Sequence, residues 1–206
     1  MDRWLQAALD YIPQWLEYQM RVSKQPGCVV AIAQRDQVVL EEAFGHADLS
    51  RGMALTPRHR FRVASHSKSF TTAGIMALRE RGRLKLDDAV GTYVDGLHPQ
   101  IAAATIGQLL SHSAGIIRDG TDSGQWQDRR AFLNEAEVRA DLAEGPTIDA
   151  NTRFKYSNHG YGLAGLAIEA IVGEPNAAWI THNIVEPAGM KRTLPEAPPA
   201  PGTTFA

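Results

Sequence analysis

The sequence predicts an α/β (α+β) protein, in which an antiparallel sheet is flanked by helices and followed by a mostly helical part. Residues 2–21 place apolar side chains at helical spacing, and residues 27–44 read as two apolar runs around a polar turn. After Gly82 the apolar runs have the spacing and the boundaries of helices. We therefore expect an α/β part at 1–82 and a mainly helical part at 83–206.

The N-terminal run predicts a helix that packs onto the sheet. Pro13 lies inside this run and is expected to kink or split it, because proline cannot donate a helical hydrogen bond. The stripe has no basic face, so a sheet is a better partner for it than a membrane surface. The residues of the stripe are Trp4, Leu5, Ala8, Leu9, Ile12, Trp15 and Leu16.

The expected sheet begins with a hairpin, and two strands alone do not complete a sheet. Residues 27–34 and 38–44 are the two strands, and Arg35-Asp36-Gln37 forms the turn. Residues 45–60 then form a loop that leads to a short strand before Ser65. An isolated hairpin is marginally stable in water, so its apolar faces call for further strands.

The following helices are predicted from apolar spacing and from their caps. Residues 70–78 are apolar or small on every side, which is typical of a helix that is buried all round. Directly after Gly82 the apolar pattern is short and irregular, and further along the chain it becomes regular. Helices are expected at 105–110, where Thr105 is the cap, and at 128–143, 163–172 and 177–185.

Composition limits the classes of partner. In 206 residues, hydrophobic residues make up 44% and charged residues 21%, and the net charge is −2. That balance is ordinary for a globular domain, and it gives no electrostatic reason to expect nucleic acid or an anionic membrane as a partner. The single Cys28, in an apolar run, is expected to be a buried structural thiol, since it has no partner within the chain.

We expect neither a cofactor nor a metal. We expect the protein to be cytoplasmic. The sequence lacks H-E-x-x-H and a phosphate-binding G-x-x-x-x-G-K-[ST] loop, and one cysteine cannot build a thiolate zinc site. The N-terminus lacks the continuous apolar core of a signal peptide, and residues 96–117 are too often interrupted for a membrane span. The expected partner is a small-molecule or short-peptide substrate.

The first candidate site is the motif S-x-x-K at Ser65 and Lys68, at the start of the helix at 70–78. Three positions are nearly one helical turn, so the hydroxyl and the amine are expected to be neighbours on one face. A serine hydroxyl becomes a nucleophile when a nearby base takes its proton. The alternative is that Ser65 caps the helix and that Lys68 is a solvated first-turn residue.

The second candidate site is Tyr156-Ser157-Asn158, which directly precedes the apolar run at 163–172. A phenol close to an amine can act as a base, because the positive charge favours the phenolate. The alternative is an Asx-type cap of the next helix, with Tyr156 merely packed.

These two motifs and their flanking residues resemble the penicillin-recognising serine hydrolases, most closely the class C β-lactamase-related esterases and D-aminopeptidases. The resemblance covers nearly the whole chain after about residue 25, and it implies a β-lactamase-like fold. The matching segments, in chain order, are FRVAS and SHSK at 61–68, RGRLKLDDAVGTYV, TIGQLLSHSAGI at 105–116, YSN at 156–158 and IVEPAGMKRT at 184–193.

The resemblance implies a role for each motif residue. Ser65 would be the acylated nucleophile, Lys68 would accept or relay its proton, and Tyr156 would be the second base. Asn158 would bind the substrate amide or hold Lys68 in place. The sequence leaves open whether Lys68 or Tyr156 takes the serine proton, because closely coupled groups titrate as a unit.

One departure from the family concerns a third motif. Family members carry a third motif, Lys or His followed by a small residue and Gly, on a later strand that also supplies an oxyanion donor. No such triplet follows Asn158, so the resemblance covers the N-terminal portion, and the C-terminal strands of the fold are expected to be absent. A truncated or split protein is therefore expected, with a C-terminal segment as a candidate partner.

The resulting functional expectation is a serine hydrolase that cleaves a carboxylester, a D-amino-acid peptide or amide, or a β-lactam through an acyl-serine intermediate. The alternatives are a non-catalytic relative that binds a peptide or cell-wall fragment, and an inactive fragment that needs a C-terminal partner. The sequence does not choose the substrate, the oligomeric state, or hydrolysis over acyl transfer. His66 is given no catalytic role, His112 is expected to be a turn residue, and His159 to line the cleft rim or cap a helix.

Overall fold

A computed structural model describes residues 3–127, 129–130 and 132–195. The chain divides into two units, one that extends to Val63 and one that begins at Ala64. The expected boundary after Gly82 differs from this division, because helix α2 (Ser67–Glu80) packs against helices of the second unit. The last residues of the expected helical part, 196–206, lie outside the described residues.

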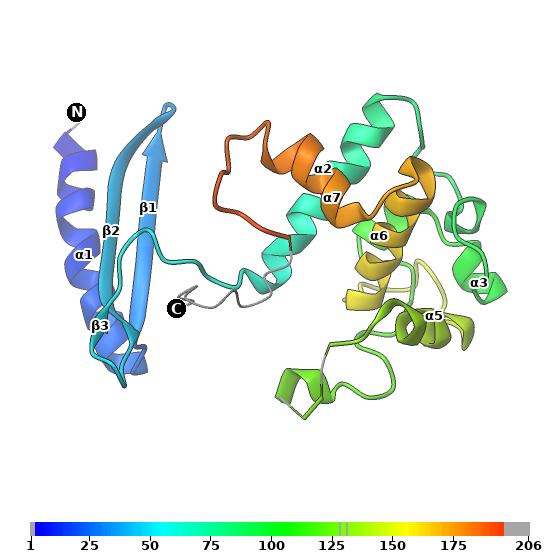
Figure 1. Ribbon diagram of the computed structural model, residues 1–206, viewed down its shortest axis with the longest axis horizontal. Helices are drawn as coiled ribbons and strands as arrows, with labels where there is room; N and C mark the ends of the chain where they lie inside the picture. Colours follow the sequence, from blue (N-terminus) through cyan, green and yellow to red (C-terminus); the bar gives the residue numbers. More distant parts are fainter. Residues whose placement is uncertain (1–2, 128, 131, 196–206) are drawn as a thin grey trace. The chain divides into compact units, whose positions relative to one another are not determined.

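The first unit is a hairpin with a helix along it (Figure 1). Its antiparallel strands follow the order β1-β2-β3, and Gly27 pairs with Gly45 at the end of the first ladder. The turn residues Arg35 and Asp36 have φ of 49° and 65°, a pair of left-handed residues that suits a two-residue hairpin turn. The elements are α1 (Arg3–Ser23), β1 (Gly27–Gln34), β2 (Gln37–Asp48) and β3 (Met53–Ala54).

Helix α1 is longer than expected and packs only in part. It continues through Pro13 as a single helix, so the expected split at this residue is absent. Leu9 is buried, but Trp4 is 71% and Trp15 is 45% exposed, which corrects their assignment to the packed stripe. Cys28, expected to be buried, is partly exposed.

Helix α2 positions the first motif and belongs to the second unit. A short 3-10 turn, η1 (Ala64–His66), precedes it, so Ser65 lies just before the α-helix rather than inside it. Gly74, Ile75 and Leu78 are buried, whereas the other residues of 70–78 are partly exposed. The expectation that this helix is buried all round therefore holds for one face only.

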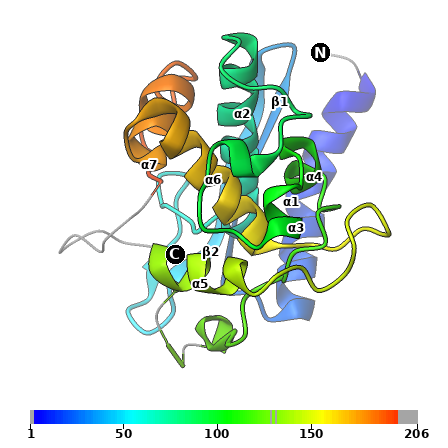
Figure 2. The same cartoon turned by 90° about the vertical axis from the view of Figure 1, so that its right-hand side faces the viewer.

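The second unit is built around helix α6 (Asn158–Val172). Figure 2 shows α6 at the centre, and α2, α4, α5 and α7 all contact it. Eight of its fifteen residues are buried, so it supplies the largest part of the core. The helix ends at Gly173, which has a left-handed φ of 78°.

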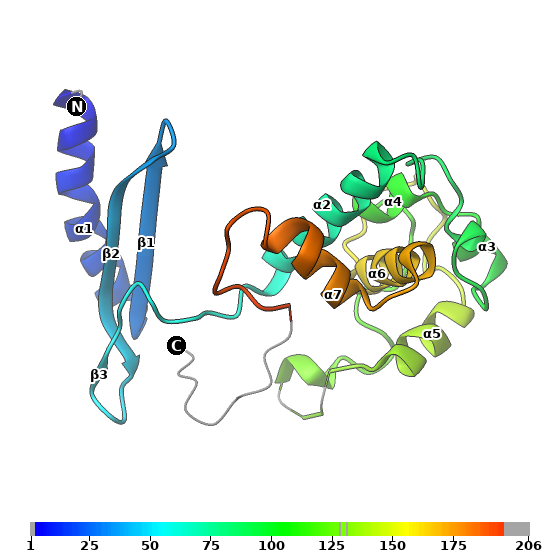
Figure 3. The same ribbon diagram turned by 45° about the horizontal axis from the view of Figure 1, so that its top comes forward.

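The remaining elements of the second unit are short and surround this core. Helices α2 and α7 lie beside one another (Figure 3). These elements are η2 (Val90–Thr92), α3 (Pro99–Ala102), α4 (Ile106–Leu110), η3 (Gly124–Gln127), α5 (Glu135–Ala143), α7 (Asn176–Ile180) and the π-helical turn η4 (Thr181–Val185).

Capping explains where two of these helices begin. Thr105 caps α4, as expected, through a capping box with Gln108. Helix α5 begins at Glu135 rather than near 128, because Asn134 and Glu137 form a second capping box. Residues 128 and 131 of the expected helix lie outside the described residues.

The described residues combine helices with an antiparallel sheet, and β3 is the last named strand before residue 195. None of the helices in this described part is both long enough and apolar enough to cross a membrane.

Candidate active site

The structure brings the two sequence motifs together. The Oγ atom of Ser65 lies 2.5 Å from the Oη atom of Tyr156, although 91 positions separate the two residues. Ser65 comes from the turn before α2, and Tyr156 comes from the segment that enters α6. Because α2 and α6 pack against each other, a shared core fixes this meeting point.

Lys68 lies on the same side of α2 and completes the group of four expected residues. Its Nζ atom donates a hydrogen bond of 2.5 Å to Oδ1 of Asn158. The same Nζ atom lies 4.8 Å from the ring centroid of Tyr156 and 5.4 Å from that of Tyr161. The positive charge of Lys68 therefore faces the phenol that is hydrogen-bonded to Ser65.

The start of α6 is held by Ser157, the middle residue of the second motif. Its Oγ atom accepts a hydrogen bond of 2.8 Å from the N–H of Gly160 and donates one of 2.6 Å to the carbonyl of Ile117. The expected cap of this helix is thus present, but Ser157 supplies it and leaves Tyr156 and Asn158 free for the site.

The electrostatic surroundings favour the phenolate form of Tyr156. Burial alone would raise the pKa of the phenol, but hydrogen bonds with Lys68 and Ser65 and the positive charges of Lys68 and Arg118 act in the opposite direction. Their combined effect lowers the pKa of Tyr156 below its ordinary value of 10.0. A lowered pKa increases the fraction of phenolate, which is the form that can accept a proton from a neighbouring hydroxyl.

His112 lies against this phenol and is a contact that sequence reasoning missed. Its ring centroid is 4.5 Å from that of Tyr156, and its Nδ1 atom accepts a hydrogen bond of 3.2 Å from the N–H of Ser157. Burial, and then the charge of Lys68, lowers the pKa of His112. A neutral imidazole therefore supports the tyrosine, in the left-handed turn (φ of 57°) that follows α4.

Two further residues, Arg118 and Asp119, join the site from the loop after α4. The Arg118 guanidinium lies 5.4 Å from the ring centroid of Tyr156, and its Nε atom is 2.9 Å from Oδ2 of Asp119. The other oxygen of Asp119 accepts a hydrogen bond of 2.5 Å from Nδ2 of Asn158. The signal in the sequence was a charged pair directly after the apolar Ile116 and Ile117.

Two other histidines stand beside the motif residues in the sequence, His66 and His159. His159 is only 3% exposed, and its Nε2 atom lies 2.9 Å from Oδ2 of Asp141. It neither lines the cleft rim nor caps the helix, the two roles expected for it, and it is instead a buried partner of α5. His66 is the N-cap residue of α2, where its side chain forms no capping hydrogen bond.

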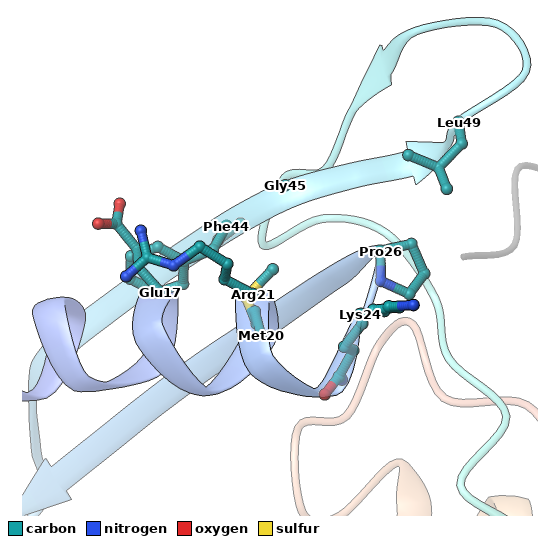
Figure 4. Close-up of a pocket in the computed structure, with 10 residues that line it drawn as sticks. Glu17, Met20, Arg21, Lys24, Pro26, Phe44, Gly45 and Leu49 are labelled. Carbon is teal, nitrogen blue, oxygen red and sulfur yellow. The ribbon is translucent and has the colours of Figure 1, made fainter.

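A hollow of about 410 Å³ opens beside the group, lined by Ser65, Arg118, Tyr156 and Asn158. A second hollow, of about 560 Å³, lies in the first unit between the end of α1 and strand β2 (Figure 4). Its lining includes Met20, Phe44 and Leu49 but no serine, cysteine or histidine. The smaller hollow is therefore the candidate active site.

The described residues contain no group of three or more His, Cys, Asp or Glu side chains that could hold a metal ion.

A serine hydroxyl, a lysine and a tyrosine of lowered pKa meet where α2 and α6 begin, a grouping of the kind used in nucleophilic catalysis. Comparison with known proteins agrees, because the sequence profile of the family described as Beta-lactamase matches residues 12–204. The chain therefore belongs to the beta-lactamase family.

Similar proteins are longer than this chain. The protein flp of Staphylococcus aureus strain MW2 is 29% identical over 182 residues, which are 86% of this chain and 36% of that protein. The octameric penicillin-binding protein homologue from Pyrococcus abyssi is 30% identical with a TM-score of 0.78, over 89% of this chain and 43% of that one. The chain thus spans less than half the length of either protein.

A third comparison concerns the fold alone. The β-lactamase/D-alanine carboxypeptidase from Pseudomonas syringae superimposes with a TM-score of 0.82 at 21% identity. The superposition covers 97% of this chain and 55% of that protein. The β-lactamase-like fold expected from the sequence is thereby confirmed.

Proposed function

We propose that this protein forms an acyl-enzyme on Ser65 and cleaves an ester or amide bond. The observation that carries the proposal is the 2.5 Å contact between the Ser65 hydroxyl and the Tyr156 phenol, whose pKa is lowered. The family to which the chain belongs supports the same chemistry.

The first step of the proposed reaction is acylation. Tyr156, as phenolate, takes the proton of Ser65 while Oγ attacks the substrate carbonyl, and a tetrahedral oxyanion forms. When the bond to the leaving group breaks, Tyr156 returns the proton to the leaving oxygen or nitrogen, and the acyl group remains on Ser65. Water, deprotonated in turn by Tyr156, then attacks the acyl carbonyl. The bond to Oγ breaks, Tyr156 returns the proton to Ser65, and the acid is released.

Lys68 and Asn158 have supporting roles in this proposal. Lys68 keeps the phenolate favoured through its charge, which faces the Tyr156 ring at 4.8 Å. Asn158 fixes the lysine ammonium through its Oδ1 atom, 2.5 Å from Nζ. Of the two candidate bases, Lys68 and Tyr156, we favour Tyr156 as the one that takes the proton of Ser65. Its pKa is lowered and its hydroxyl contacts that of Ser65.

The substrate class proposed is a carboxylester, a D-amino-acid peptide or amide, or a β-lactam. The names of similar proteins, a penicillin-binding protein homologue and a β-lactamase/D-alanine carboxypeptidase, support this range. The hollow of about 410 Å³ beside Ser65 has room for a compact substrate.

We also propose that full turnover needs polypeptide beyond this chain. The backbone N–H of Ser65 would donate one hydrogen bond to the oxyanion. In the family that the sequence resembles, a later strand supplies the second donor. Loss of one such donor costs roughly 3 kcal/mol of barrier, about a hundredfold or more in rate. The chain covers only 36% of the Staphylococcus relative, which favours a C-terminal segment as the partner.

The test is covalent labelling of Ser65 with a fluorophosphonate, located by mass spectrometry. We expect label on Ser65, loss of it in Ser65→Ala, and unchanged labelling in Ser69→Ala, which alters an exposed serine on the same helix. Addition of a polypeptide that carries the remaining strands should increase turnover of an ester substrate. Absence of label on Ser65, both alone and with that polypeptide, would overturn the proposal.

A further inference from the structure

Asp119 connects the loop after α4 to the second motif. Its Oδ1 atom accepts a hydrogen bond of 2.5 Å from Nδ2 of Asn158, and its Oδ2 atom lies 2.9 Å from Nε of Arg118. The Asp119 side chain is 12% exposed, whereas that of Arg118 is 68% exposed. Asp119 is therefore an inward-facing carboxylate with both oxygens engaged.

The hydrogen-bonding chemistry of Lys68 and Asp119 determines how the Asn158 amide is oriented between them. An ionised carboxylate only accepts hydrogen bonds, and a lysine ammonium only donates them. The Asn158 amide lies between the two, so its NH₂ must face Asp119 and its Oδ1 must face Lys68. The opposite orientation would set donor against donor at Lys68 and acceptor against acceptor at Asp119.

The backbone supports the same arrangement. The N–H of Asn158 donates a hydrogen bond of 2.8 Å to the carbonyl of Arg118. This backbone contact connects the loop after α4 to the start of α6 without the Asp119 carboxylate. The carboxylate is therefore not needed merely to attach the loop. Its distinct contribution is the direction in which the Asn158 amide points.

We propose that Asp119 is a positioning residue that acts through Asn158. It holds the Oδ1 atom of Asn158 toward Lys68 and so keeps the lysine ammonium beside the Tyr156 phenol. This inference rests on the proposed acylation of Ser65, and it assigns Asp119 no contact with the substrate.

The test is a double-mutant cycle on the rate of fluorophosphonate labelling of Ser65 in the whole chain. Asp119→Asn keeps the size of the side chain but adds a donor, and we expect labelling to slow about tenfold, a typical coupling for contacting residues. In an Asn158→Ala background the same change should have an effect of less than about twofold, because the residue through which Asp119 acts is gone.

A matched control and a spectroscopic readout accompany the cycle. Asp122→Asn alters a carboxylate of the same loop that binds the N–H of Gly124 rather than Asn158, and we expect it to leave labelling unchanged. In NMR spectra, the Asn158 side-chain NH₂ should be slow to exchange with solvent in the original chain and fast in Asp119→Asn. If Asp119→Asn does not fold, Asp119→Glu, which keeps the carboxylate, takes its place in the cycle and should retain more labelling than Asn158→Ala.

Two outcomes separate this inference from the proposed function. If the original chain is labelled on Ser65 and Asp119→Asn slows labelling equally in both backgrounds, Asp119 acts independently of Asn158 and the inference is overturned. An unchanged labelling rate in Asp119→Asn would overturn it as well. Failure of the original chain to label, both alone and with the polypeptide that carries the remaining strands, would instead overturn the proposed acylation.

Discussion

The hydroxyls of Ser65 and Tyr156 lie 2.5 Å apart across 91 positions of sequence. The contact is a consequence of the core of the second unit, because α2 and α6 pack together and each presents its N-terminal end to the same hollow. The proposed nucleophile and its proposed base are thereby placed by buried apolar residues that have no role in the proposed chemistry.

Removal of the phenol oxygen should abolish most of the reactivity of Ser65. In Tyr156→Phe the general base is lost, and we expect fluorophosphonate labelling to slow by roughly 10²- to 10⁴-fold. The ring itself remains in contact with His112, so the thermal unfolding temperature should change little. Labelling rates and unfolding curves of the same preparations check both expectations.

Tyr161→Phe is the matched control for this change. The Tyr161 hydroxyl donates a hydrogen bond of 3.0 Å to the carbonyl of Leu110 and lies 3.2 Å from the hydroxyl of Thr72, away from Ser65. Its loss should cost about 1 kcal/mol of stability and leave the labelling rate nearly unchanged. Equal slowing in Tyr161→Phe and Tyr156→Phe would show that the phenol of Tyr156 has no special role.

The labelling rate should rise with pH as Tyr156 loses its proton, and Arg118 should set the midpoint in part. The charge of Arg118 is one of the causes that lower the pKa of Tyr156. In Arg118→Gln this positive charge is removed, the phenolate is less favoured, and the midpoint should move to higher pH. A midpoint that stays in place would contradict the assignment of Tyr156 as the base. The pH profile of labelling gives the answer directly.

The expected site residues were accessible from the sequence because each belongs to a short motif at the start of a helix. Ser65 with Lys68 was expected from helical spacing, and Tyr156 with Asn158 from the motif that precedes the apolar run at 163–172. Their mutual distance could be inferred only from the family resemblance, because no local pattern reports a contact across 91 positions. The structure supplies that contact.

Asp119 and His112 could not be found in this way. The role of each depends on a partner far along the chain, Asn158 for Asp119 and Tyr156 for His112. In the fold, by contrast, local chemistry was informative: Thr105 was expected to cap the helix at 105–110, and it forms a capping box with Gln108. The division of the chain depends on how α2 packs, which the sequence pattern alone did not fix.

His112 should make the stability of the protein depend on pH below neutrality. Burial, followed by the charge of Lys68, lowers its pKa from 6.5, so the folded state favours the neutral ring. Below pH 6.5 the unfolded chain binds more protons at this residue, and stability is lost as the pH falls toward the lowered value.

The variant His112→Asn tests that dependence. Asparagine tolerates the left-handed φ of 57° found at this position but does not titrate. We expect the difference in unfolding temperature between pH 7.5 and pH 5.5 to be smaller in the variant than in the original chain. A difference of the same size in both would assign the acid sensitivity to other groups.

Gly115 should be essential to the loop that carries Arg118 and Asp119. Its carbonyl accepts a hydrogen bond of 3.0 Å from the N–H of Thr147, and its φ is 75°. A Cβ atom at this position would lie 2.0 Å from the carbonyl oxygen of Ile148, a backbone atom that cannot rotate away. Gly115→Ala should therefore displace the loop, with a loss of about 3 kcal/mol or more of stability and slower labelling of Ser65.

Gly96→Ala separates the clash from the backbone conformation. Gly96 has a similar φ of 78°, but a Cβ atom there meets nothing within 4 Å. This variant should lose only about 1–2 kcal/mol, the cost of a left-handed alanine, and should label at the original rate. Chemical denaturation of the two variants gives the comparison, and equal losses would mean that the close approach of Ile148 to Gly115 is easily relieved. The larger loss at Gly115 is expected because the strained φ is the same and only the contact differs.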